Sequence, residues 1–161
     1  MLDSLEQSAL GQWVAYSPAG YYIMLAFHAI GLAMLVGSVT VIDLRLLGFV
    51  RGINEKAMAG LIKFAWFGLA VNVVSGISLF TSEANKAFYS NSFRVKILLM
   101  VCGVISTVVL NRTVLQPTFH KGGEAVSASN ARTQAYLSLT LWLATIIVAR
   151  LMSYWTEFTK T

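Results

Sequence analysis

Residues 21–42 read YYIMLAFHAIGLAMLVGSVTVI, an apolar run in which His28 is the one ionisable side chain apart from the two leading tyrosines. A membrane-spanning helix needs roughly 20 mostly apolar residues, so this run is long enough to cross a bilayer. Three further apolar runs follow, and helix-compatible flanks extend them to a similar length. The sequence therefore predicts four spans, at about residues 19–42, 60–82, 93–114 and 134–155.

The composition agrees with a membrane protein. Hydrophobic residues make up 57% of the chain, charged residues only 12%, and the mean hydropathy is +0.68. A soluble domain carries about 25% charged residues. Backbone groups in hydrocarbon must pair internally, which restricts the spans to helices or a closed barrel, and these runs lack the alternation of barrel strands. We expect an all-α fold, an integral membrane four-helix bundle that forms a single domain over residues 1–161.

The segment before the first span has its own pattern. Residues 2–16 are expected to form one short amphipathic helix at the membrane surface, with Ser4 and Gln7 as a capping box. Ser17 is then the expected N-cap of the first span, and Pro18 its first helical residue.

The first apolar run differs from a signal peptide. The segment before it is acidic, with Asp3 and Glu6, and charged residues rather than a small-residue cleavage site follow it. We expect the run to remain in the mature protein. After it, Asn54 is the expected N-cap of the second span.

The net charge of +5 raises two interpretations, nucleic-acid binding and membrane topology. The basic residues are scattered singly among the loops, which favours topology and no nucleic-acid partner. One side of the predicted bundle holds Arg45, Arg51, Lys56, Lys63, Arg112, Lys121 and Arg132, and the other holds Lys86, Arg94, Lys96, Arg150 and Lys160. The positive-inside bias therefore predicts an inner-membrane protein with both termini in the periplasm.

Polar side chains within spans are candidate functional residues, because they are costly in lipid. On the second span Gly68, Asn72 and Gly76 recur every four residues, with Ser75 beside them. Small residues let helices approach closely, and amides and hydroxyls hydrogen-bond across the contact. One interpretation is therefore helix packing, in which Ser138, Trp142 and Thr145 of the fourth span take part as well.

His28 supports a second interpretation, because imidazole is a common ligand of metals and of haem iron. Met100 has a similar predicted depth and is a candidate second axial ligand. Arg150 suits a haem propionate or a quinone oxygen, and Asn72 completes the candidate cofactor site for haem b or a quinone. The alternative is a structural His28 that bonds a serine or a backbone carbonyl.

Two further features of the sequence are interpreted as structural. Asp43 and Arg45 are expected to end the first helix, to set topology, and to pair with each other or with Arg112. Cys102 lies alone in the third span and is expected to be a packing residue. Motifs of the HExxH, CxxC, GxSxG and P-loop types are absent.

Several segments resemble an uncharacterised family of small bacterial inner-membrane proteins with four helices. They are HAIGLAMLVG at residues 28–37, DLRLLG at 43–48, FRVK at 93–96, and SLTLW at 138–142 followed by Arg150. The resemblance implies the same fold, and at the level of fold alone a similarity to copper-resistance and cytochrome b561-type membrane proteins. Members often have Phe-His near the end of the third helix, where this chain has Leu110-Asn111, so a metal site there is not expected.

Three functions follow as hypotheses. The first is an accessory or interaction subunit of a membrane system, respiratory in one version, whose partners are the bilayer and other subunits or further copies. The second is electron transfer through a b-type haem or a quinone. The third, transport of a small solute or a metal ion, ranks last, because the sequence places no acidic residue between the ends of the predicted spans.

Overall fold

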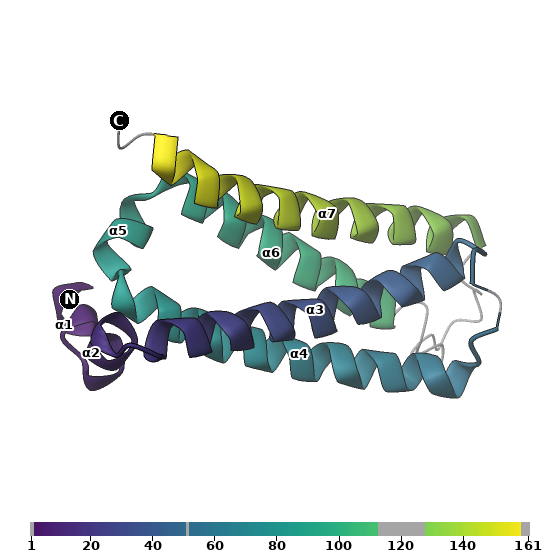
Figure 1. The fold of residues 1–161 in the computed structure, drawn as a ribbon. Helices are drawn as coiled ribbons and strands as arrows, with labels where there is room; N and C mark the ends of the chain where they lie inside the picture. The colour runs from purple at the N-terminus through teal and green to yellow at the C-terminus, as the bar shows by residue number, and fades with distance from the viewer. Residues whose placement is uncertain (1, 51, 113–127, 159–161) are drawn as a thin grey trace. The chain divides into compact units, whose positions relative to one another are not determined.

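The computed structural model describes residues 2–50, 52–112 and 128–158, and these residues form helices without a strand. The helices are α1 (Leu2–Glu6), α2 (Ala9–Tyr16), α3 (Gly20–Leu46), α4 (Glu55–Ser82), α5 (Ala84–Tyr89), α6 (Asn91–Leu110) and α7 (Ala128–Phe158) (Figure 1). Four of them contain segments long and apolar enough to cross a membrane: Gly20–Leu46, Lys56–Ser82, Asn91–Leu110 and Asn130–Leu151. The predicted all-α class is confirmed, and the chain is a multi-pass membrane protein.

The helix boundaries follow the caps more closely than the ends of the apolar runs. The second span begins at Lys56 rather than near residue 60, because Asn54 caps α4. Its Oδ1 accepts the amide N–H of Ala57 at 2.8 Å, which confirms the predicted cap. The third span covers Asn91–Leu110, a little earlier than the expected 93–114.

The chain separates into two compact units, each of which takes part of α3 and part of α4. The first unit comprises Met1–Gly37 and Lys63–Asn91, and the second comprises Ser38–Ile62 and Ser92–Thr161. The first unit therefore holds α1, α2 and α5 with parts of the two long helices. The second holds α6 and α7 with the remaining parts.

The N-terminal segment forms two helices, so the expectation of one helix over residues 2–16 is wrong. Ser8 separates them because its side chain caps α2, accepting the amide N–H of Gly11 at 3.1 Å. Ser17 ends α2 rather than starting the first span, and its amide donates to the Trp13 carbonyl at 3.0 Å. Pro18 lies in the turn that follows, and α3 begins at Gly20.

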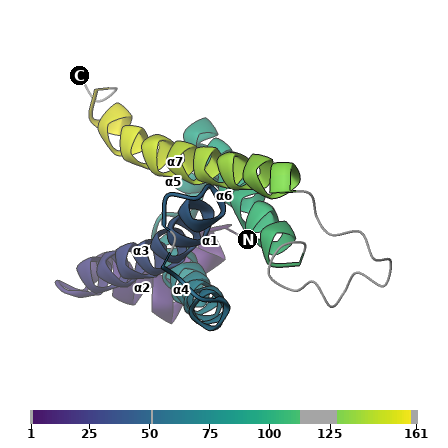
Figure 2. The same cartoon turned by 90° about the vertical axis from the view of Figure 1, so that its right-hand side faces the viewer.

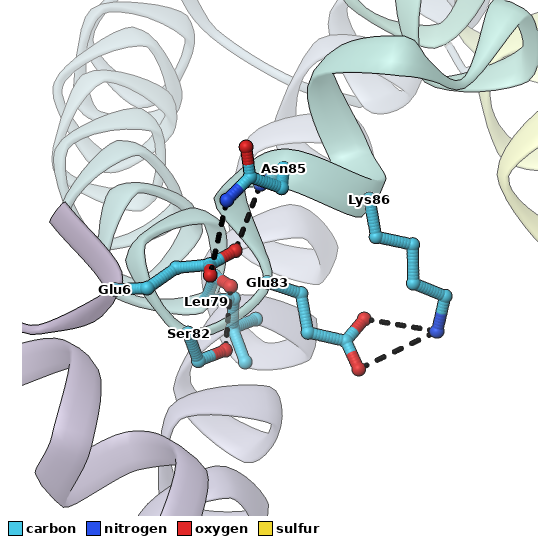
Figure 3. A network of polar contacts seen from close by, with 6 residues as sticks. All are labelled: Glu6, Leu79, Ser82, Glu83, Asn85 and Lys86. Carbon is cyan, nitrogen blue, oxygen red and sulfur yellow. Dashed lines mark hydrogen bonds and ion pairs between the residues drawn. The ribbon is translucent and has the colours of Figure 1, made fainter. Parts of the chain in front are cut away.

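Acidic side chains attach the N-terminal helices to α5, which lies beside α1 in Figure 1. The Asn85 backbone N–H donates to Glu6 Oε1 at 2.8 Å, and its Nδ2 donates to Glu6 Oε2 at 3.2 Å (Figure 3). The same Nδ2 also donates to Asp3 Oδ1 at 2.8 Å. The nearby exposed ion pair between Lys86 and Glu83, at 3.2 Å, completes the network. The acidic residues of α1 therefore hold this segment within the first unit.

In the second unit α7 packs on α6, and the two helices are inclined to each other in Figures 1 and 2. Trp142 of α7 is 1% exposed and packs on Gly103 of α6, where an added Cβ would lie 3.1–3.3 Å from the indole ring. The Trp142 Nε1–H also donates to Thr107 Oγ1 at 3.3 Å. A separate apolar cluster in the same unit is formed by Ile42, Met58, Ile62 and Leu110.

Candidate functional site

The centre of the first unit is a close, antiparallel contact between α3 and α4. A Cβ added to Gly31 would lie 2.7 Å from the Asn72 amide nitrogen and 2.8 Å from the Gly68 carbonyl oxygen. A Cβ added to Gly68 would lie 2.7 Å from the Cβ of Met34. Only glycine allows the two backbones to approach this closely, as in other membrane helix pairs.

Asn72 at that contact and His28, one turn before Gly31 on α3, join the two helices by hydrogen bonds. The Asn72 Nδ2 donates to the His28 carbonyl oxygen at 2.9 Å. In return, His28 Nδ1 lies 3.1 Å from the Asn72 carbonyl oxygen and 3.3 Å from Ser75 Oγ. Asn72 and Ser75 are each 2% exposed, so these bonds are shielded from lipid. This reciprocal arrangement matches the structural interpretation of His28, a bond to a serine or a backbone carbonyl.

Gly76 makes room for the imidazole ring. A Cβ at this position would lie 3.2 Å from His28 Cε1 and 3.4 Å from Nδ1. Ser75 is oriented by its own helix, because its hydroxyl donates to the Val71 or the Asn72 carbonyl oxygen, at 2.7 and 3.1 Å. The small polar stripe on α4 therefore fixes the position of the His28 ring.

The chemistry of His28 follows from its tautomer. With the proton on Nδ1, the ring donates to the Asn72 carbonyl oxygen and carries its lone pair on Nε2. A ring N–H held by a backbone carbonyl is also the usual outer contact of histidines that ligate a metal through the other nitrogen. The geometry therefore supports helix packing directly and is compatible with a ligand role.

The other residues of the predicted cofactor site belong to the second unit. Met100 is partly buried on α6, and Arg150 is exposed on α7. Their association with His28 stays a prediction. Among the described residues, no group of three or more His, Cys, Asp or Glu side chains lies close enough together to hold a metal ion. His120 and Lys121 lie outside the described residues.

Asp43 departs from its expected environment. It is 0% exposed, and neither carboxyl oxygen has a hydrogen-bond partner among the described residues. The predicted pairing with Arg45 or Arg112 is therefore absent from the described part of the chain. Residues two apart on a helix point in different directions, so a buried Asp43 turns Arg45 away from it. Asp43 also lies inside α3, which places an acidic side chain within a span.

Sequence reasoning missed the polar contact of Gln134 on α7 with Ser106 on α6. Gln134 Nε2 donates to the Ser106 backbone carbonyl oxygen at 3.1 Å and lies 3.0 Å from its Oγ. Gln134, Ser138 and Trp142 recur every four residues, and this spacing was the available signal for a polar face. The Ser138 hydroxyl has no hydrogen-bond partner among the described residues, and the Thr145 hydroxyl donates to Leu141 of its own helix at 2.8 Å.

The comparisons with known proteins agree with the family resemblance. Searches of curated proteins and of solved structures found no match. The model of one protein family, described as a family of unknown function, matches residues 3–155, which is nearly the whole chain. The segments that carry the resemblance, from HAIGLAMLVG to SLTLW and Arg150, all lie inside this range. The chain belongs to the family of unknown function DUF6644.

Proposed function

We propose that this protein is an accessory subunit that packs against another membrane protein or a further copy of itself. The observation that carries the proposal is a row of small, exposed residues on α3, formed by Ala29, Ala33 and Gly37. They recur every four residues and therefore share one face of the helix. Around Gly37 there is open space, with no heavy atom within 4 Å of an added Cβ.

A row of this kind has a specific use in a membrane. Lipid chains are as apolar as leucine, so helices associate there through close backbone packing rather than through hydrophobic burial. The Gly31 and Gly68 contact already shows α3 using this chemistry on its inner side. The exposed row offers the same chemistry to a helix outside the first unit.

The interaction proposal is tested by replacing Gly37 with leucine. The wild-type protein, purified in mild detergent and measured by native mass spectrometry, is expected to run above the monomer mass. Gly37→Leu should return it to the monomer, because the larger side chain prevents close approach. Gly60→Leu is the matched control, since Gly60 is also helical and exposed with open space around it, but lies on α4. A monomeric wild type would contradict packing against a further copy of the protein, and equal effects of the two variants would contradict the role of the row on α3.

A second candidate function is electron transfer through a b-type haem or a quinone. The observation that favours it is the contact of His28 Nδ1 with the Asn72 carbonyl oxygen, which suits ligation through Nε2. His28 would be the axial ligand, with Met100 as a candidate second ligand and Arg150 as an anchor for a polar group of the cofactor.

The haem version predicts a Soret band in protein expressed with haem supplied. His28→Ala should abolish the band, because the axial ligand is lost. Ser75→Ala should keep it, since the Asn72 carbonyl still holds Nδ1. The absence of any band in the wild type, or full haem content in His28→Ala, would rule out the haem ligand assignment.

We also propose that the protein resides in the inner membrane with both termini in the periplasm. The support is the distribution of Lys and Arg: Arg45, Lys56, Lys63, Arg112 and Arg132 lie at or near one set of span ends. Basic residues near span ends favour the cytoplasmic side.

A further inference from the structure

Within the first unit, α2 packs against the ends of both long helices. A Cβ added to Gly11 of α2 would lie 2.9 Å from the carbonyl oxygen of Thr81, which belongs to the last turn of α4. The carbonyl oxygen of Trp13 would lie 2.5 Å from a Cβ added to Gly20, the first residue of α3. Val14 is 0% exposed. α2 therefore lies at the level where the first span begins and the second span ends.

α5 lies at the same end of these helices. α4 ends at Ser82 and α6 begins at Asn91, so the short α5 joins two consecutive spans and stays near one membrane surface. Glu6 of α1 accepts both the backbone N–H and the side-chain Nδ2 of Asn85 on α5 (Figure 3). α1 and α2 contain no basic residue, so attraction to anionic lipid does not position them. Their contacts with α4 and α5 do.

Exposed aromatic side chains lie at this end on three helices. They are Trp13 and Tyr16 of α2, Tyr21 and Tyr22 of α3, and Phe88 and Tyr89 of α5. Each is between 43% and 78% exposed, and the set includes four of the six tyrosines of the chain. Tyrosine and tryptophan combine an apolar ring with a polar group, which suits the boundary between hydrocarbon and headgroups better than either water or the bilayer centre.

We propose that α2 and α5 hold this end of the first unit in the headgroup layer of a phospholipid bilayer. The rings then lie at the hydrocarbon boundary, and the tyrosine hydroxyls and the Trp13 N–H meet the polar lipid groups and water. Lipid is the partner because these residues flank the ends of two spans, where the bilayer surface must pass. The depth of α2 is set by its packing on α4 rather than by the helix alone. The proposal concerns this depth and is independent of the row on α3.

The experiment measures the depth of single tryptophans in the full-length protein, reconstituted in liposomes of phosphatidylethanolamine and phosphatidylglycerol. In the first probe Trp13 is the only tryptophan, and the other three are replaced by phenylalanine. Bromine on the lipid quenches fluorescence, and it is placed either near the headgroup end of the acyl chain or near the terminal methyl group. The shallow bromines are expected to quench Trp13 about twofold more strongly than the deep ones, because its indole lies at the interface.

Two further probes complete the measurement. Tyr89→Trp, in a chain without other tryptophans, should show the same shallow preference as Trp13. A chain that keeps only Trp66 is the matched control and should show the opposite preference, because Trp66 is 38% exposed and lies well inside the second span. Comparison of the wild type with Trp13→Phe gives the Trp13 signal without replacement of the buried Trp142.

Gly11→Leu tests whether packing sets the depth of α2. The added side chain does not fit against the Thr81 carbonyl oxygen, so α2 must leave the end of α4. Shallow quenching of Trp13 is expected to fall about twofold, to the level of a ring outside the interface. Trp66 in the same variant should stay deep, which shows that the span is still inserted. Ala9→Leu is the control, since it adds the same side chain at an exposed position of α2.

Three results would overturn the proposal. Stronger quenching of Trp13 by aqueous iodide than by either brominated lipid would place α2 in water. Protection of Trp13 from iodide and from both lipids would show that a protein covers this end instead. Shallow quenching that is unchanged in Gly11→Leu would show that α2 reaches the interface without its packing on α4.

Discussion

Gly31→Ala is expected to destabilise the protein by about 3 kcal/mol, at the upper end of what one added methyl group does in a packed contact. The new Cβ would lie 2.7 and 3.0 Å from the amide nitrogen and the Cα of Asn72, and 2.8 Å from the Gly68 carbonyl oxygen. These are backbone atoms, which cannot rotate away as a side chain does. The helices must separate, and the His28 and Asn72 hydrogen bonds weaken with them. Unfolding in mixed detergent and SDS micelles measures the change.

Gly37→Ala provides the matched control on the same helix. An added Cβ at Gly37 meets no heavy atom within 4 Å, so the substitution only improves helix propensity, by up to about 1 kcal/mol. Alanine is also small enough to preserve the exposed row on α3. If both variants changed the free energy of unfolding equally, the close approach of α3 and α4 at Gly31 would be disproved.

The second large effect is expected for Trp142→Ala, with a loss of about 4 kcal/mol in the free energy of unfolding. Trp142 is 1% exposed, its ring fills the space above Gly103, and its Nε1–H donates to Thr107 Oγ1. Removal of the indole leaves a cavity between α6 and α7 that the remaining side chains fill only partly. The same micelle unfolding assay measures this loss.

Two further substitutions divide the contribution of Trp142 into packing and hydrogen bonding. Trp142→Phe keeps most of the ring packing and loses the N–H donor, so a smaller loss of about 1 kcal/mol is expected. Trp66→Ala is the control, because Trp66 is 38% exposed and leaves a smaller defect. A loss for Trp142→Ala no greater than that for Trp66→Ala would refute the assigned packing role.

The apolar runs in the sequence were sufficient to predict the four spans. Runs such as residues 21–42 leave lipid as the only favourable solvent, and backbone pairing in lipid then requires helices. The Asn54 cap was also readable, because a side chain that bonds its own helix start depends on neighbours in the sequence. The N-terminal helices were harder, since Ser4 and Ser8 are both acceptable caps in the sequence, whereas the structure places Ser4 inside α1 and uses Ser8 as the cap of α2.

The candidate site was likewise predictable only in part. Spacing placed Gly68, Asn72 and Gly76 on one face of α4, but it did not identify Gly31 as the residue opposite Gly68 or Asn72 as the partner of the His28 carbonyl. Asp43 shows the limit most clearly. Its position near a helix end suggested a paired charge, whereas the structure buries it with no hydrogen-bond partner among the described residues.

The sequence by itself determined the solvent, the helical class and the approximate limits of the four spans, because these depend on local composition and on backbone hydrogen bonding. Tertiary structure alone decided which polar groups meet: His28 with Asn72, Trp142 with Thr107, and Asp43 with no described hydrogen-bond partner. The physical reason is that a helix fixes the face on which a side chain lies, while its partner depends on the rotation and offset of the neighbouring helix.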